Sequence, residues 1–324
     1  MKVFITKRIP EQGLEILRDA GISITQFTEK RELSKDEFIA ACLQHDALLS
    51  AGKNIIDEPF LEKCHHLKGI SLLSVGYDNV DIQAATKYKV PISNTPGVLS
   101  GATSDIALLL MLSVSRKAFH WHNIIGKGEW GFFEPTAGLG MEITGKTLGI
   151  FGMGQIGSEL ARKCKAACSM KIIYHNRSRN FKAEQELGAT YVSWDELLLQ
   201  SDVLSVHANL SEETKGLFNT QAFKKMKPTA IFINTARGAI HNETDLIDAL
   251  EKGIIWGAGL DVTNPEPMAK DNPLLTMPTV CILPHIGSAT LETRSTMSVI
   301  AAKNIVAALQ GNQMPQAINP EAYQ

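Results

Sequence analysis

Three side chains that can bind an anion or move a proton each follow an apolar run in the second half of the sequence: Arg237, Glu266 and His285. A guanidinium can hold a carboxylate through two hydrogen bonds, and an imidazole beside a carboxylate can carry a proton near neutral pH. Taken singly, they are equally well explained as a surface ion pair, a loop carboxylate and a turn histidine. Each stands, however, at the expected carboxyl end of a strand, where open α/β sheets bind their ligands. Together with a glycine-rich segment upstream, they predict a catalytic site.

That glycine-rich segment lies between positions 147 and 179 and has the context of a dinucleotide-binding site. An apolar run at 148–151 is followed by three glycines, a helix-like segment and a second apolar run at 170–174. This order of strand, tight turn, helix and strand is the one that a dinucleotide fingerprint requires. The free N–H groups at the helix start then face the phosphates. The alternative is a glycine-rich connection in an ordinary α/β domain. The residues expected to bind the cofactor here are Gly152, Gly154, Gln155, Ile156 and Gly157.

The end of the second strand favours NADPH over NADH. An acidic residue at this place usually holds the ribose 2′-hydroxyl of NAD, but no carboxylate is present here. Guanidinium groups match the geometry of a phosphate, which is the group that distinguishes NADP from NAD. We therefore predict that NADP(H) is preferred and NAD(H) possible. The alternative is that the arginines are solvated loop charges. The residues expected to bind the cofactor at this strand end are Asn176, Arg177, Ser178 and Arg179.

Length, composition and charge limit the classes of protein to which the chain can belong. A chain of 324 residues with 44% hydrophobic and 20% charged residues predicts a globular protein of about two domains. The net charge of −2 gives no reason to expect nucleic acid. The N-terminus lacks an apolar region typical of a signal peptide, and the longest apolar run, Ile106–Leu112, is far short of the roughly 20 residues that span a bilayer. Five scattered cysteines without metal-ligand spacing predict reduced thiols and no metal site. We expect a cytoplasmic protein.

Strands alternate with helices along the whole chain, which predicts two doubly wound parallel sheets. Within the first hundred residues, Ser34 and Glu37 form an expected capping box. A single long helix is expected from about Thr103 to Ile125, with Thr103 either capping it or facing a cofactor. No regular element is expected in the loop 126–146. The last helix, 291–309, should return to the first domain. The expected domains are 1–98 with 289–324, a flavodoxin-like substrate-binding domain, and 99–288, a Rossmann dinucleotide-binding domain.

Several motifs give the chain a specific resemblance. It resembles the D-2-hydroxyacid dehydrogenases, most closely the glyoxylate/hydroxypyruvate reductase branch, which includes 2-ketogluconate reductases. The resemblance covers nearly the whole chain, and the motifs match in order and spacing. The matching segments are Ser74 to Asn79, Gly152 to Gly157, Asn234 to Gly238, Gly259 to Val262 and Pro284 to Thr290.

The resemblance implies a reaction and a set of roles. It implies that Arg237 binds the carboxylate and keto oxygen of a small 2-oxo acid. His285 is then the proton donor and Glu266 its partner. The backbone of Val75 and Gly76 is implied to hold the other end of the carboxylate, and the protein is implied to be a homodimer. Further residues are implied to contact the cofactor, Thr103, Thr214, Thr235, Ala236, Asp261 and Gly287, or the substrate, Ser288.

The sequence also departs from the family pattern and leaves two alternatives open. Asn209 stands where relatives commonly have proline, and His241-Asn242-Glu243 replaces a more usual Val-Asp-Glu. Gly138-Leu139 stands where close relatives carry a tryptophan thought to reach the partner subunit's substrate, so the preferred 2-oxo acid stays open. One alternative is a nucleotide-sensing, corepressor-like protein, which the short tail after the last helix disfavours. The other is a phosphoglycerate dehydrogenase, for which the turn Ser50–Lys53 offers only one lysine.

Overall fold

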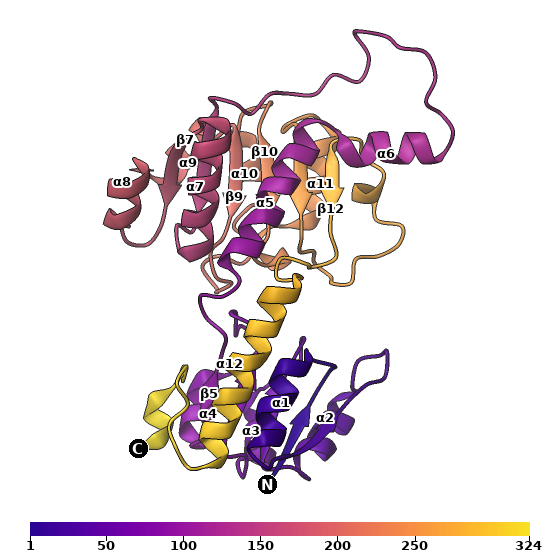
Figure 1. The fold of residues 1–324 in the computed structure, drawn as a ribbon. Helices are drawn as coiled ribbons and strands as arrows, with labels where there is room; N and C mark the ends of the chain where they lie inside the picture. The colour runs from indigo at the N-terminus through magenta and orange to yellow at the C-terminus, as the bar shows by residue number, and fades with distance from the viewer. The chain divides into compact units, whose positions relative to one another are not determined.

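The computed structural model describes residues 1–324, which divide into two compact units. Unit 1 comprises Met1–Val98 and Ser288–Gln324, and unit 2 comprises Leu99–Gly287. Each unit contains one parallel sheet with helices on it (Figure 1). The predicted fold class, two doubly wound α/β domains, is confirmed.

Unit 1 is built on a five-stranded sheet in the order β2-β1-β3-β4-β5. All of its strand pairs are parallel, because a helix returns the chain after each strand. The strands are β1 (Lys2–Ile5), β2 (Ser23–Gln26), β3 (Ala47–Ser50), β4 (Ile70–Leu72) and β5 (Ile92–Ser93). The helices are α1 (Glu11–Asp19), α2 (Lys35–Cys42), α3 (Glu58–Cys64), α4 (Ile82–Lys87), α12 (Leu291–Leu309) and the 3₁₀ helix η3 (Pro320–Tyr323).

The C-terminal helix α12 completes the core of unit 1. It packs on α1, where a Cβ on Gly13 would lie 2.7 Å from the carbonyl oxygen of Ser298, so the two backbones touch. Ala301 and Ile305 of α12 are fully buried against the first strands. In α2 of the same unit, the Ser34–Glu37 capping box forms as predicted.

Unit 2 is built on a seven-stranded parallel sheet in the order β12-β11-β10-β9-β6-β7-β8. The strands are β6 (Thr147–Phe151), β7 (Lys171–His175), β8 (Thr190–Tyr191), β9 (Val203–Val206), β10 (Ile231–Asn234), β11 (Gly257–Leu260) and β12 (Val280–Ile282). The α-helices are α5 (Ser100–Ser115), α6 (Ala118–Gly126), α7 (Gln155–Cys168), α8 (Phe181–Leu187), α9 (Trp194–Gln200), α10 (Thr220–Lys225) and α11 (Glu243–Glu251). The 3₁₀ helices are η1 (Gly238–Ile240) and η2 (Pro273–Leu275).

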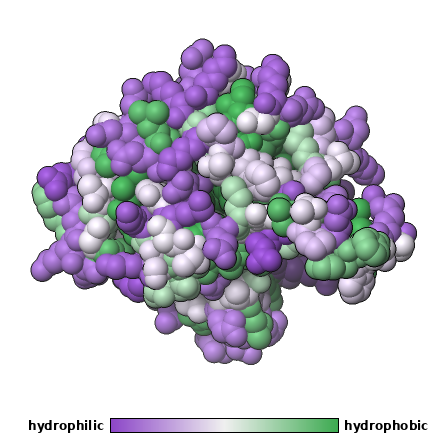
Figure 2. Space-filling view, turned by 90° about the horizontal axis from the view of Figure 1, so that it is seen from above, coloured by the Kyte–Doolittle hydropathy of each residue, from purple (hydrophilic) through white to green (hydrophobic).

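Helices cover both faces of this sheet, which explains why its strands are almost wholly apolar. One core cluster joins the sheet to α5, α7 and α8, and another joins it to α9, α10 and α11. The five cysteines of the chain are all buried and none forms a disulfide, as predicted. No helix of the protein is long and apolar enough to cross a membrane. In the face shown in Figure 2, polar residues predominate and separate smaller apolar patches.

The prediction of a single helix from Thr103 to Ile125 is wrong. The chain forms α5 and α6, separated at Lys117, whose φ of 53° is left-handed. No glycine or proline signals this break, and the conformation costs a lysine about 1 kcal/mol. A tertiary contact accompanies it, because the Lys117 ammonium lies 5.1 Å from the centre of the Trp256 ring. Thr103 is likewise not the helix cap, since that position is Leu99.

Candidate active site

Residues from three neighbouring strands of unit 2 meet at one edge of the sheet, which we call the carboxyl edge. Strands β10, β11 and β12 are adjacent, and Arg237, Glu266 and His285 follow them in that order. Nδ1 of His285 lies 2.6 Å from Oε1 of Glu266. The histidine side chain is 42% exposed and the glutamate 21%, so one side of the pair is open. The imidazole therefore has its Nδ1 bound to a carboxylate and its Nε2 available.

Asp261, at the end of β11, fixes the backbone around His285. Its two carboxylate oxygens accept hydrogen bonds from the N–H groups of Ile286 (2.8 Å) and Gly287 (2.7 Å). The two N–H groups belong to the residues immediately after His285, whose φ of 55° is left-handed. Burial raises the pKa of Asp261, and the two N–H donors oppose that shift. The predicted cofactor residue thus has both oxygens engaged with the segment that carries the histidine.

Thr103 and Gly287, both predicted to contact the cofactor, lie together. The Thr103 hydroxyl, in the first turn of α5, donates to the Gly287 carbonyl oxygen at 3.2 Å. A Cβ on Gly287 would lie 3.1 Å from Asp261 and 3.3 Å from Thr103. The segment after β12 is therefore held from both sides.

Arg237 lies three residues after the end of β10, in an extended conformation. Its Nη1 donates to the carbonyl oxygen of Ala236 at 2.8 Å, and its own carbonyl accepts from Asn234 at 2.9 Å. The guanidinium is partly buried, so its charge acts in a medium less polar than water. Thr235 faces His207, a residue that sequence reasoning did not select, with Oγ1 3.4 Å from Nδ1. His207 in turn bonds Ser205 at 2.8 Å, so polar side chains link the ends of β9 and β10.

The glycine turn after β6 has the shape needed for a dinucleotide. Gly152 has a φ of 99°, and a Cβ there would lie 2.5 Å from the backbone nitrogen of Ala208. Only glycine fits this tight turn. Gly154 caps α7, and a Cβ there would meet nothing within 4 Å. Gln155 and Ile156 begin the helix, whose first N–H groups have no partner within the helix and can bind an anion. Gly157 packs against the Gly152 carbonyl, where a Cβ would lie only 2.7 Å away. The residues present fit a bound pyrophosphate.

The segment after β7 was predicted to bind the 2′-phosphate of NADP, and two of its side chains form contacts within the protein. Oδ1 of Asn176 accepts from the Met153 N–H at 2.7 Å and so braces the glycine turn. Arg179 forms an ion pair with Glu184 of α8 (2.6 Å) and stacks on Phe181. Arg177 is exposed. Glu184 is a carboxylate that the sequence pattern did not reveal, because it lies beyond the strand end.

The other predicted contacts lie in loops. Thr214 is part of an exposed turn, where its hydroxyl accepts from the Ser211 N–H at 2.8 Å and donates to the Asn209 carbonyl at 2.8 Å. In unit 1, the carbonyl of Val75 accepts from Asn94, and that of Gly76 accepts from Ser74, both at 2.7 Å. The N–H groups of Val75 and Gly76 have no hydrogen-bond partner within the protein. Ser288 begins the second segment of unit 1 and is half-buried.

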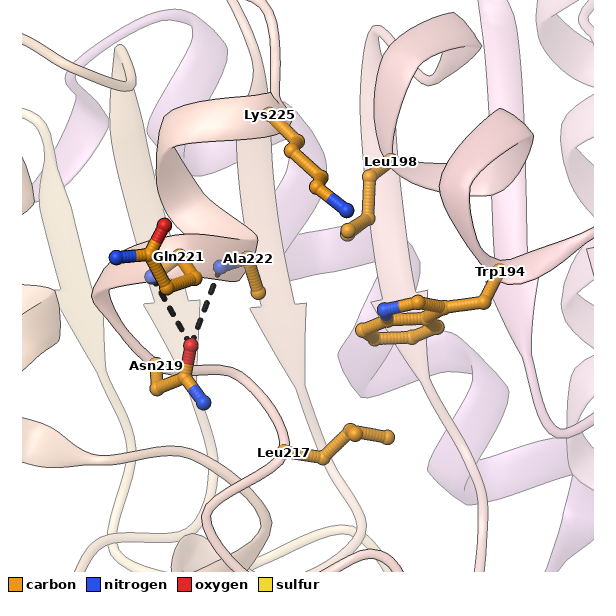
Figure 3. Close-up of a pocket in the computed structure, with 7 residues that line it drawn as sticks. All are labelled: Trp194, Leu198, Leu217, Asn219, Gln221, Ala222 and Lys225. Atoms are coloured by element: carbon orange, nitrogen blue, oxygen red, sulfur yellow. Dashed lines mark hydrogen bonds between the residues drawn. The ribbon is translucent and has the colours of Figure 1, made fainter.

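A separate pocket of unit 2 contains none of the predicted residues. It measures about 170 Å³ and lies between α9 and α10, with Trp194 opposite Ala222 (Figure 3). Leu198 and Leu217 supply further apolar walls, and Lys225 stands at its rim. Lys225 is the one titratable side chain that lines it, so this pocket holds no acid/base pair.

One buried histidine near that edge gives the stability of the protein a pH dependence. His241 is 1% exposed, and burial lowers its pKa to about 4. An unfolded histidine titrates near 6.5, so the unfolded chain binds more protons between these values. The contribution of His241 to stability should therefore fall by about 2 kcal/mol as pH is lowered from about 7 to about 5. Burial lowers the pKa of His207 to about 4 as well, so His207 adds a loss in the same range. Equilibrium urea unfolding measures the total loss, and His241→Asn should remove the His241 share of it while the His207 share remains. An unchanged profile in the variant would contradict the assignment.

Comparison with known proteins defines the class. The family model described as D-isomer specific 2-hydroxyacid dehydrogenase, NAD binding domain, matches residues 108–287. The chain is 40% identical to a glyoxylate reductase of Thermococcus litoralis over 324 residues, covering 99% of this chain and 97% of that protein. The chain therefore belongs to the D-isomer-specific 2-hydroxyacid dehydrogenase family and is an NAD(P)-dependent oxidoreductase.

Solved structures agree with this assignment. A protein of Thermus thermophilus superposes with a TM-score of 0.92 at 36% identity, covering 98% of this chain and 100% of that one. An NADPH-dependent glyoxylate/hydroxypyruvate reductase of Sinorhizobium meliloti, solved with NADP and malonate, superposes with a TM-score of 0.84 at 27% identity. That similarity covers 100% of this chain and 98% of the other.

Proposed function

We propose that the protein reduces a small 2-oxo acid with NADPH, hydroxypyruvate to the D-2-hydroxy acid or glyoxylate to glycolate. The observation that carries the proposal is the His285–Glu266 contact of 2.6 Å, which lies at the same sheet edge as Arg237 and the glycine turn. The names of the relatives favour the same reaction. Reduction of the carbonyl group requires a hydride at the carbon and a proton at the oxygen. His285 at this edge can supply the proton, and the glycine turn can hold the cofactor that supplies the hydride.

Arg237 is proposed to bind the substrate carboxylate and polarise the keto oxygen. A guanidinium binds carboxylate in a fixed, two-pronged geometry, which orients the adjacent carbonyl. His285 is proposed to donate the proton from Nε2, because Nδ1 faces Glu266. The Glu266 carboxylate stabilises the imidazolium and holds the ring in one orientation. In the oxidation direction, the neutral imidazole accepts the proton. The free N–H groups of Val75 and Gly76, with Ser288, are proposed as additional substrate contacts.

The cofactor is proposed to bind the glycine turn through residues 152–157. When bound, its nicotinamide supplies the hydride. Asp261, Thr235 and Ala236 are proposed to border the nicotinamide, and Thr214 to line the loop that follows β9. Thr103 and Gly287 support the same edge through their hydrogen bond. These assignments rest on the family motifs and on the position of each residue at the carboxyl edge.

Preference for NADPH is proposed to depend on the two arginines after β7. Replacing Arg177 and Arg179 together by alanine should raise the KM for NADPH about 10- to 100-fold, which corresponds to one or two charge-assisted hydrogen bonds. The KM for NADH should change little, because NADH has no 2′-phosphate. Steady-state kinetics with both cofactors measures the difference. Lys182→Ala, which removes an exposed cation of α8, is the control. Equal effects on both cofactors would show that the arginines are only surface charges.

The protein is proposed to be a homodimer that buries an apolar face of unit 2. Large apolar side chains are exposed on α5, α6 and the loop 127–146, although such exposure is unusual in a monomer. Light scattering should give twice the 35.4 kDa mass of one chain. Replacing Leu109 and Leu112 by glutamate should yield the monomer, and a monomeric wild type would refute the proposal. The exposed residues are Leu109, Leu112, Trp121, Ile125, Trp130, Phe132, Phe133 and Leu139.

A cytoplasmic location completes the proposal. The five cysteines are buried and none forms a disulfide, which is typical of proteins from a reducing compartment. The proposed reductant, NADPH, is likewise supplied inside the cell. Fractionation of cells that express the protein would place it, and recovery in the membrane fraction would contradict the proposal.

The reaction itself is tested by steady-state kinetics with a panel of 2-oxo acids. Glyoxylate and hydroxypyruvate should each support NADPH oxidation, and pyruvate is a useful comparison because it differs only in the side chain. Measurable binding of NADPH without turnover of any 2-oxo acid would instead indicate a nucleotide-sensing protein.

A further inference from the structure

Asn234, the last residue of β10, has every polar group of its side chain engaged. It is fully buried. Its Oδ1 accepts from the N–H of Ala236 at 3.0 Å, and its Nδ2 donates to the carbonyl of Arg237 at 2.9 Å. The same Nδ2 lies 3.0 Å from Nδ1 of His241. The contact with Ala236 fixes which end of the amide is oxygen, because a backbone N–H can only donate.

This arrangement determines the state of His241. An amide nitrogen donates and does not accept, so Nδ1 of His241 must accept the second proton of Asn234. The imidazole is then neutral, with its proton on Nε2. Burial favours the same state, since it lowers the pKa of the ring by disfavouring its charged form. The ring stands edge-on to Phe232 and is 1% exposed, so its position is fixed by packing. Nε2 has no hydrogen-bond partner in the protein.

The backbone after Arg237 is confined on its other side. A Cβ on Gly238 would lie 2.0 Å from the carbonyl oxygen of Thr263. Thr263 belongs to the loop that leads from β11 to Glu266. The peptide that carries Arg237 therefore lies between Asn234 and the Glu266 loop. A shift of that peptide would move the backbone position from which the Arg237 side chain extends.

We propose that His241 is a positioning residue for Arg237: by accepting from Asn234, it holds the amide that fixes the Arg237 carbonyl. The inference rests on the proposed role of Arg237 in substrate binding. Without the acceptor, the second Asn234 proton is buried and unpaired, a state that is unfavourable and promotes rotation of the amide. The Arg237 carbonyl then keeps only its hydrogen bond from the Ile240 N–H (3.1 Å), and the less firmly held guanidinium binds the carboxylate less well. The KM for the 2-oxo acid should rise more than kcat falls.

Two variants separate positioning from packing. His241→Leu retains apolar volume and removes the acceptor, whereas His241→Asn places an oxygen close to the position of Nδ1. The leucine variant should show a KM for hydroxypyruvate about tenfold higher, in line with the loss of one buried hydrogen bond. The asparagine variant should recover most of that loss, and the Kd of NADPH should be unchanged in both. His65→Leu, a change at an exposed histidine of unit 1, is the matched control. A normal KM in the leucine variant, or equal impairment in both, overturns the proposal.

A second measurement on the wild-type protein keeps the inference independent of turnover. Nitrogen-15 NMR of labelled histidine reports which ring nitrogen carries the proton, and the His241 signals are assigned by their absence in His241→Asn. The Nε2–H tautomer at pH 7 is expected, and an Nδ1–H tautomer or a charged ring overturns the proposal. If the wild type reduces no 2-oxo acid, the proposed function fails, and the tautomer still shows whether the His241–Asn234 hydrogen bond exists.

Discussion

Replacing Arg237 by glutamine should lower kcat/KM for a 2-oxo acid by about a thousandfold. The proposed guanidinium contact is charged, two-pronged and partly buried, and losing such a contact costs on the order of 4 kcal/mol. The loss should fall on both KM and kcat, because Arg237 is proposed to bind the carboxylate and also to polarise the carbonyl. Arg237→Lys should recover only part of it, since an ammonium cannot form the paired geometry.

The Arg237 variants require a parallel test of cofactor binding. Fluorescence titration with NADPH should give the wild-type Kd for Arg237→Gln, and the melting temperature should be close to that of the wild type. Arg162→Gln, which removes an exposed arginine of α7, controls for the loss of one positive charge in unit 2. A variant that binds NADPH poorly but turns over bound complexes normally would move Arg237 out of the substrate site.

Replacing His285 by glutamine should reduce kcat by about 10²- to 10⁴-fold, the usual range for removal of a general acid. The KM for the 2-oxo acid should change less, because Arg237 still binds the carboxylate. Glu266→Gln should give a smaller loss, since glutamine can still orient the ring but does not stabilise its charge. Steady-state kinetics at saturating NADPH measures all three proteins.

The control for this series is His65→Gln, a change at an exposed histidine remote in sequence from the carboxyl edge. Near-normal turnover in His285→Gln would show that another group donates the proton. His207, the next histidine of unit 2 near the ends of β9 and β10, would then be the residue to test.

The fold could be predicted wherever local patterning and tertiary packing agree. Buried strands separated by amphipathic helices indicated the two parallel sheets, and the Ser34–Glu37 capping box was visible as a spacing of three residues. The break at Lys117 was not predictable, because its left-handed backbone accompanies a contact with Trp256, far away in the sequence. A run of helix-forming residues cannot show such a contact.

The candidate site could be predicted as a set of residue types at strand ends, but not as a network. Arg237, Glu266 and His285 were identified because each follows a buried strand. The carboxylate–amide contacts of Asp261 and the Asn234–His241 hydrogen bond depend on how loops from different strands meet. Glu184, which pairs with Arg179, lies in α8, the helix that follows the strand end where the pattern predicts an acid. Spacing along the chain carries no information on these pairings.

The most direct test of the account is the configuration of the product formed from hydroxypyruvate and NADPH. The purified protein should convert the pair to NADP and D-glycerate in equal amounts, measured by chiral separation of the product. Arg237→Gln and His285→Gln should each abolish most of this conversion. Formation of L-glycerate, or no NADPH-dependent reduction of hydroxypyruvate, glyoxylate or any other 2-oxo acid, would contradict the proposed function.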